Sequence, residues 1–109
     1  MSTLALIISH TAHAGKRDDV RRVWETYMAP AIASNPDHVA YFYCFDNGDP
    51  DSISAFQLYT SLEASEQFLR THAYAEYLRH VEPLLVGPPR VTTLTPVWTK
   101  IASQSGVAQ

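Results

Sequence analysis

The chain has 109 residues, of which 46% are hydrophobic, and its formal net charge at pH 7 is −3. This length fits one globular domain, and the apolar fraction is ordinary for a buried core. No block of Lys and Arg could neutralise a run of phosphates, which argues against nucleic acid as a partner. Cys44 is the single cysteine, which excludes an internal disulfide and a multi-cysteine metal site.

The sequence shows neither a signal peptide nor a membrane span. The N-terminus lacks the basic segment and long apolar core of a signal peptide, and no apolar run approaches the roughly 20 residues of a membrane span. We therefore expect a soluble, cytoplasmic protein that does not enter a membrane. One domain is expected over residues 1–100, followed by a disordered tail over residues 101–109, which are mostly small and polar.

The first half of the chain predicts a strand, a helix and a hairpin. Residues 4–10 are a short apolar run rich in β-formers and predict a strand. From Lys16 apolar residues recur at intervals of three and four, which predicts an amphipathic helix. Pro30 lies inside this pattern and lacks a backbone donor, so we expect the helix to kink or end just before it. Residues 39–46 and 53–59 predict two strands around an Asn-Gly-Asp-Pro-Asp turn.

The second half predicts two helical pieces and a last strand. Thr60 and Glu63 have the spacing of a capping box, which predicts that a short helix begins there. A second helical piece is expected from Thr71 or His72, and it ends at a Gly-Pro-Pro turn. Residues 91–99 predict the last strand, and the proline within it indicates an edge or a bulge.

This order of elements belongs to the ferredoxin-like βαββαβ arrangement. It is an α+β fold with a four-stranded antiparallel sheet and helices on one face. Both hairpin strands, residues 39–45 and 53–59, are apolar on both faces. Two helices cover one face only, so the other should lie against a second subunit. The sequence therefore predicts a homodimer and leaves open which set of side chains faces the helices.

Residues 55–81, AFQLYTSLEASEQFLRTHAYAEYLRHV, resemble a segment of the antibiotic biosynthesis monooxygenase family. These are small proteins of the dimeric α+β barrel type, and they include quinol monooxygenases and haem-degrading monooxygenases. In the family a strand ending in Glu, one residue and Trp runs into Ser, a helix with a His, and a second helix after a break. The resemblance covers residues 4 to about 98 and implies the same fold.

Several residues depart from the family pattern. Gln57 stands where the family usually has Glu, Tyr59 where it has Trp, and Phe68 where many members have a helix histidine. Leu78 takes the position of the axial histidine of haem-degrading members, and His80 should point elsewhere on its helix. Haem degradation is therefore disfavoured.

The resemblance implies a cofactor-independent monooxygenase of a quinol or polyphenol-like aromatic molecule. In the family, oxygenation needs no metal or flavin, because the deprotonated substrate itself supplies electrons to dioxygen. A non-catalytic dimeric α+β barrel that binds a small ligand is the alternative, since the ionisable groups of the motif are lost. No phosphate loop, nucleophile elbow or dinucleotide fingerprint occurs, which disfavours nucleotide and acyl-enzyme chemistry.

Such an oxygenase needs a dry cavity, groups that orient the substrate, and a base for a phenolic proton. Histidine is the usual base near neutral pH. We rank His72 first as catalytic residue, because it lies at the helix break that borders the family's pocket, and His10 second. The histidines lack helical metal spacing and neighbouring carboxylates, so no metal site is expected. The expected substrate-binding residues are Tyr59, Gln57, Tyr77, Phe68, Trp24, Phe42 and Phe56.

Overall fold

The computed structural model describes residues 3–100, and the tail expected over residues 101–109 lies outside the described residues. In chain order the elements are β1 (Leu4–Thr11), α1 (Arg17–Tyr27), α2 (Ala29–Ala33), β2 (His38–Phe45), β3 (Ser52–Tyr59), α3 (Leu62–Phe68), α4 (His72–Val81), the short 3₁₀ helix η1 (Glu82–Leu84) and β4 (Arg90–Leu94). The predicted βαββαβ order is confirmed. Within residues 3–100, no helix has the length and hydrophobicity that a membrane span requires.

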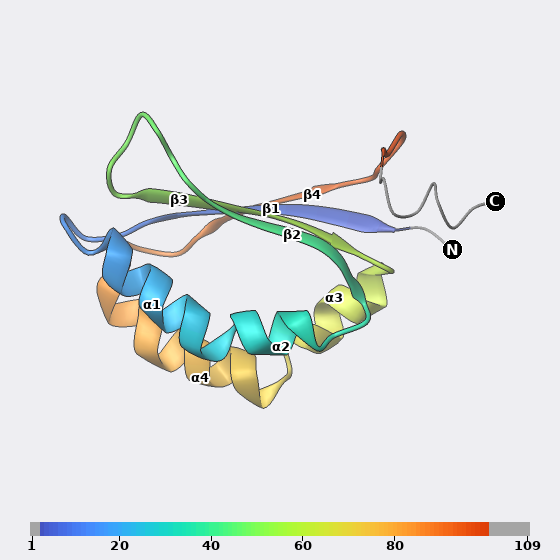
Figure 1. The fold of residues 1–109 in the computed structure, drawn as a ribbon, viewed down its shortest axis with the longest axis horizontal. Coiled ribbons are helices and arrows are strands. Elements are labelled where there is room, and N and C mark those ends of the chain that lie inside the picture. The colour runs from blue at the N-terminus through green and yellow to red at the C-terminus, as the bar shows by residue number, and fades with distance from the viewer. Residues whose placement is uncertain (1–2, 101–109) are drawn as a thin grey trace.

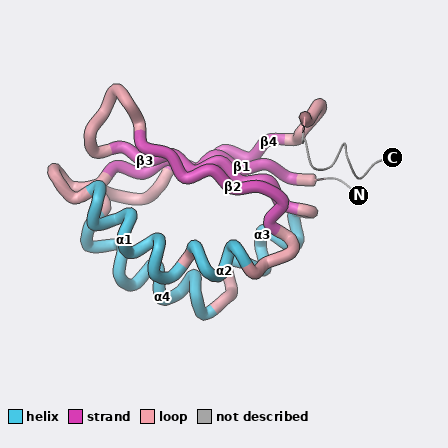
Figure 2. Tube along the Cα trace, viewed as in Figure 1, coloured by secondary structure: helices cyan, strands magenta, loops and turns pink. Residues whose placement is uncertain are grey.

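The four strands form one antiparallel sheet in the order β2-β3-β1-β4. Helices α1 to α4 lie together on one of its faces, as Figures 1 and 2 show. The sheet stays open, with β2 and β4 at its edges. This is the α+β ferredoxin-like fold that the sequence predicts.

Proline divides the first helical segment as expected. Helix α1 ends at Tyr27 and α2 begins at Ala29. Pro30 lies in the first turn of α2, where its missing N–H removes no hydrogen bond. The predicted break before this proline is confirmed.

The cap of α3 lies one residue later than the sequence predicts. Ser61 Oγ accepts a hydrogen bond from the Ala64 N–H at 3.0 Å, and Ser61 is the N-cap. Thr60 instead donates its hydroxyl proton to Asp37 Oδ1 at 2.8 Å, which fastens the end of β3 to the loop before β2. The last strand is also shorter than residues 91–99, because β4 ends at Leu94.

A bulge in β2 decides which side chains face the helices. The pairing of β2 with β3 shifts register between His38 and Ala40. Val39 is left 42% exposed, whereas His38 packs edge-on against Phe68 of α3, with 4.7 Å between ring centroids. Beyond the bulge the alternation resumes with Tyr41 on the helix side.

The opposite side of the sheet, called the open face below, is apolar and no described helix covers it (Figure 1). Phe42 is 58% exposed and Phe56 is 39% exposed, and their ring centroids lie 6.2 Å apart. By strand register this face includes Ile7, Ala40, Phe42, Cys44, Phe56 and Leu94.

Candidate functional site

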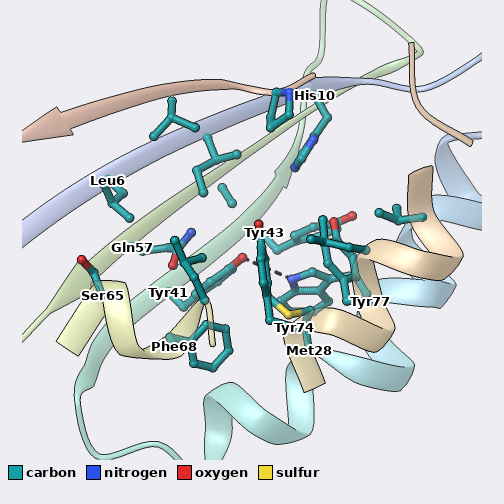
Figure 3. Close-up of a pocket in the computed structure, with 18 of the residues that line it drawn as sticks. Leu6, His10, Met28, Tyr41, Tyr43, Gln57, Ser65, Phe68, Tyr74 and Tyr77 are labelled. Atoms are coloured by element: carbon teal, nitrogen blue, oxygen red, sulfur yellow. Dashed lines mark hydrogen bonds between the residues drawn. The ribbon is translucent and has the colours of Figure 1, made fainter. Parts of the chain in front are cut away.

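A pocket of about 630 Å³ lies between the helix side of the sheet and the helices (Figure 3). Its volume lies within the range of roughly 300–1,000 Å³ that is usual for small-molecule sites. Strand alternation sends every second side chain into it, and α1, α3 and α4 form the other wall. From β1 the lining residues are Leu4, Leu6, Ile8 and His10.

Trp24 of α1 organises the aromatic wall. Its ring stacks on Tyr43 with 4.2 Å between centroids and 20° between planes. Its indole Nε1 donates a hydrogen bond to Tyr41 Oη at 3.2 Å, drawn as a dashed line in Figure 3. Phe68 and Tyr74 continue the wall from α3 and α4, with 6.4 Å between their ring centroids. A flat aromatic ligand fits such surroundings.

The tyrosines of the pocket are neutral phenols. Burial raises the pKa of Tyr41 to about 12. It raises the pKa of Tyr43, Tyr59, Tyr74 and Tyr77 as well. At neutral pH these side chains therefore serve as hydrogen-bond donors or acceptors and not as bases.

His10 is the pocket histidine best placed to act as a base. It lines the pocket from β1, and its Nδ1 is buried with no hydrogen-bond partner among the described residues. Burial lowers the pKa of its imidazole below the ordinary value of 6.5. The ring is therefore uncharged at neutral pH and free to accept a proton from a ligand.

Two further predicted residues, Gln57 and Tyr59, also line the pocket. They are 4% and 2% exposed, respectively, and they point inward from β3. With His10, Trp24, Phe68 and Tyr77 they form the part of the predicted site that the structure brings together.

Three predicted site residues lie elsewhere. His72, which was ranked first, is exposed at the first position of α4 and does not line the pocket. Phe42 and Phe56 lie on the open face, because the strand register sends their neighbours Tyr41, Tyr43 and Gln57 inward. The apolar pattern of both faces is the reason that sequence alone did not separate the two sets.

The structure adds pocket residues that sequence reasoning missed. Tyr41 and Tyr43 come from β2, Ser65 and Glu66 from α3, and Tyr74 from α4. The alternation of Tyr41 and Tyr43 was visible in the sequence, but its direction was not.

His38 packs behind the pocket wall. Its ring centroid lies 4.3 Å from that of Tyr59. Asn35 Nδ2 donates to His38 Nδ1 at 2.9 Å, so the proton of the neutral ring is on Nε2, which is buried without a partner among the described residues. Burial lowers the pKa of His38, while Gln57 and Asp37 oppose that shift.

Metal ligands are not grouped in the part of the chain that the structure describes. Among residues 3–100, no three His, Cys, Asp or Glu side chains are placed to hold a metal ion.

Comparison with known proteins shows the fold. No protein-family model matches the sequence, and no curated protein is significantly similar to it. A solved structure from Chloroflexus aurantiacus, described provisionally as an antibiotic biosynthesis monooxygenase, superposes with TM-score 0.79 at 22% identity, covering 91% of this chain and 97% of that one. A variant of SnoaB, a cofactor-independent oxygenase from Streptomyces nogalater, superposes with TM-score 0.77 at 16% identity, covering 91% and 97%.

A third structure, from Caulobacter crescentus and with the same provisional description, gives TM-score 0.82 at 16% identity, covering 89% of this chain and 92% of that one. At these identities the likeness shows the fold. The resemblance read from the sequence is confirmed at that level: the chain has the α+β ferredoxin-like fold of antibiotic biosynthesis monooxygenase domain proteins.

Proposed function

We propose that the protein is a cofactor-independent monooxygenase of a quinol or polyphenol-like aromatic molecule and that it works as a homodimer. The observation that carries the proposal is His10, an uncharged histidine at the wall of an aromatic pocket, whose buried Nδ1 has no hydrogen-bond partner among residues 3–100. The shared fold with SnoaB, which is a cofactor-independent oxygenase, supports the reaction class.

In the proposed reaction His10 accepts the phenolic proton of the bound substrate. The resulting phenolate reduces dioxygen far more readily than the neutral phenol. One dihydroxyarene and one dioxygen give one hydroxyquinone and one water. Dioxygen takes up four electrons, two from oxidation of the quinol and two from replacement of a ring C–H bond by C–O. Trp24 and Phe68 flank the ring, and Gln57 and Tyr59 orient its oxygens.

The test is oxygen uptake with menadiol, measured against an equal amount of heat-denatured protein. General-base assistance is typically worth 10²- to 10⁴-fold, so His10→Ala should reduce uptake by at least about tenfold. His72→Ala is the matched control, because this histidine is exposed outside the pocket, and its uptake should equal that of the wild type. Unchanged uptake in His10→Ala contradicts the role of His10.

The alternative is a non-catalytic protein that binds a small aromatic ligand. Gln57 and Phe68 favour it, since both are buried pocket residues without an ionisable group. Wild-type protein that binds aromatic ligands but gives no uptake across a panel of quinols and polyphenols would support this alternative.

The open face supports the homodimer. Phe42 and Phe56 present aromatic rings to solvent in the single chain, and soluble monomers rarely leave such a surface uncovered. A second copy of the same face is the proposed cover.

A further inference from the structure

Five phenols line the pocket from three elements. Tyr41 and Tyr43 come from β2, Tyr59 from β3, and Tyr74 and Tyr77 from α4. Figure 3 shows Tyr41 and Tyr74 reaching into the same part of the pocket from opposite walls. Burial raises the pKa of Tyr59 and of Tyr77, and the neighbouring phenols Tyr41 and Tyr74 raise both values further.

Each phenol hydroxyl can donate one hydrogen bond and can also accept one. Among the described residues the cluster makes one hydrogen bond, from Trp24 Nε1 to Tyr41 Oη. Tyr41 is the acceptor in this bond, so its own O–H proton remains available. Trp24 also stacks on Tyr43, and these two contacts hold the indole N–H in place. Tyr41 is therefore a donor whose position is set before a ligand arrives.

We infer that Tyr41, positioned by Trp24 and assisted by Tyr74, donates hydrogen bonds to an anionic oxygen of the ligand, so that the pocket selects the phenolate form of a hydroxylated aromatic molecule. Hydrogen bonds to a charged oxygen are stronger than those between neutral groups. The low polarity of the surroundings increases their strength further. The inference deepens the proposed function and rests on it for the identity of the substrate class.

The charges of other titratable groups at the pocket indicate which phenol is the main hydrogen-bond donor to an anionic ligand oxygen. Glu66 of α3 and Glu82 of η1 line the pocket but are exposed, so solvent screens their charge. Burial raises the pKa of Tyr74 and Glu82 raises it further, so both oppose an anion there. His10 on β1 is neutral until it takes up a proton, after which it attracts the phenolate. Tyr41 is therefore the principal donor, and Tyr74 is secondary.

The experiment titrates 4-nitrophenol bound to the protein, because its phenolate absorbs visible light. Loss of the Tyr41 hydroxyl should raise the pKa of the bound ligand by about one unit, a tenfold change in the phenolate-to-phenol ratio. Tyr41→Phe is the direct variant. Trp24→Phe keeps an aromatic ring but loses the N–H, and it should give part of the same shift. Tyr27→Phe is the matched control: Tyr27 contacts His80 outside the pocket, and the ligand pKa should stay at the wild-type value.

Near-ultraviolet circular dichroism and thermal melting establish that each variant is folded, and Tyr41→Phe alone decides the inference if Trp24→Phe does not fold. A bound-ligand pKa in Tyr41→Phe equal to that in the wild type overturns the inference. Wild-type protein that binds only the neutral phenol, or neither form, also overturns it.

No oxygen is consumed in this titration, which separates it from the test of the proposed function. Selective phenolate binding without oxygen uptake rejects the monooxygenase and retains the phenolate site. Oxygen uptake that depends on His10, together with an unchanged ligand pKa in Tyr41→Phe, retains the monooxygenase and rejects the phenolate site.

Discussion

Burial makes the contribution of His10 and His38 to stability depend on pH. Desolvation lowers the pKa of both in the folded chain from the ordinary value of 6.5, with Gln57 and Asp37 opposing the shift at His38. Between the lowered pKa and about 6.5 the unfolded chain binds more protons than the folded chain. The free energy of unfolding should therefore decrease as pH falls through this window, and Tm should be lower at about pH 5.5 than at about pH 7.5.

The variant His10→Gln should reduce this difference in Tm, because one of the two half-buried imidazoles no longer titrates. His13→Gln is the control, since His13 is exposed in the loop after β1 and folding does not desolvate it. Asp49 and Glu76 also have lowered pKa values, but their contribution is lost only as pH falls below the ordinary values of 3.8 and 4.5 and through the lowered ones. Equal pH dependence in wild type and His10→Gln contradicts the prediction.

Sequence reasoning predicted the positions of single side chains less well than it predicted helices and strands. Gln57, Tyr59 and Phe68, which were named from their family positions, line the pocket. Family position did not show which histidine lines the pocket, because the burial of a side chain depends on contacts with elements that are distant in sequence. The bulge at Val39 also reverses the side on which His38 lies, and no turn residue marks a bulge there.

Arg17 joins the start of α1 to the β2–β3 hairpin. Its Nη1 donates to the carbonyl oxygens of Asp46, Asp49 and Ser52 at 3.0, 2.9 and 3.2 Å. Its guanidinium lies 4.0 Å from the ring centroid of Phe45. We expect Arg17→Ala to lower the free energy of unfolding by about 1–2 kcal/mol, because water replaces only part of these contacts. Thermal melting should show a decrease in Tm of roughly 5–10 °C.

Arg22→Ala is the matched control for this element. Arg22 pairs with Asp19 on the exposed surface of the same helix, and such pairs typically contribute less than about 1 kcal/mol. Arg17→Lys should lie between wild type and Arg17→Ala, since it keeps the charge but not the planar group that stacks on Phe45. A loss of stability in Arg22→Ala as large as that in Arg17→Ala would show that the contacts between Arg17 and the hairpin do not stabilise the fold.

Elements were more predictable than single residues because their signals are local. The spacing of apolar residues marked α1, and Pro30 marked its end. The cap of α3 was misplaced by one position because Thr60 and Ser61 are both capping residues, and Asp37, distant in sequence, binds the hydroxyl of Thr60. Contacts such as those of Arg17 had no sequence signal, since they link residues about 30 positions apart.

At the scale of the whole molecule, the described helices cover one face of the sheet and leave the open face uncovered. Helices α1 to α4 lie on one side of the sheet (Figure 2), and the other side presents aromatic and aliphatic residues. The two-sided apolar hairpin in the sequence already implied this surface. It did not show that Phe42 and Phe56 lie on this face as exposed neighbours.

We expect the wild type to be a dimer of about twice the 12.2 kDa chain mass by light scattering at micromolar concentration. Its Tm should rise with protein concentration, since association stabilises the folded state by mass action. Phe42→Glu would place an unpaired charge in the buried interface, which costs several kcal/mol, and should weaken the dimer by at least about a hundredfold. Leu69→Glu is the control, because Leu69 is 55% exposed at the end of α3, in the helix layer on the other side of the sheet.

The same substitution separates the two possible states of the wild type. In a stable monomer, exchange of a residue that is 58% exposed for Glu removes no buried contact, so Phe42→Glu would keep or raise Tm and leave the mass unchanged. In a dimer whose subunits meet through the open face, Phe42→Glu lowers both the mass and the Tm. The double variant with Phe56→Glu lowers them further, because the two rings are neighbours and both charges would lie in one interface. A wild type that scatters as a folded single chain contradicts the homodimer and leaves the open face without a cover.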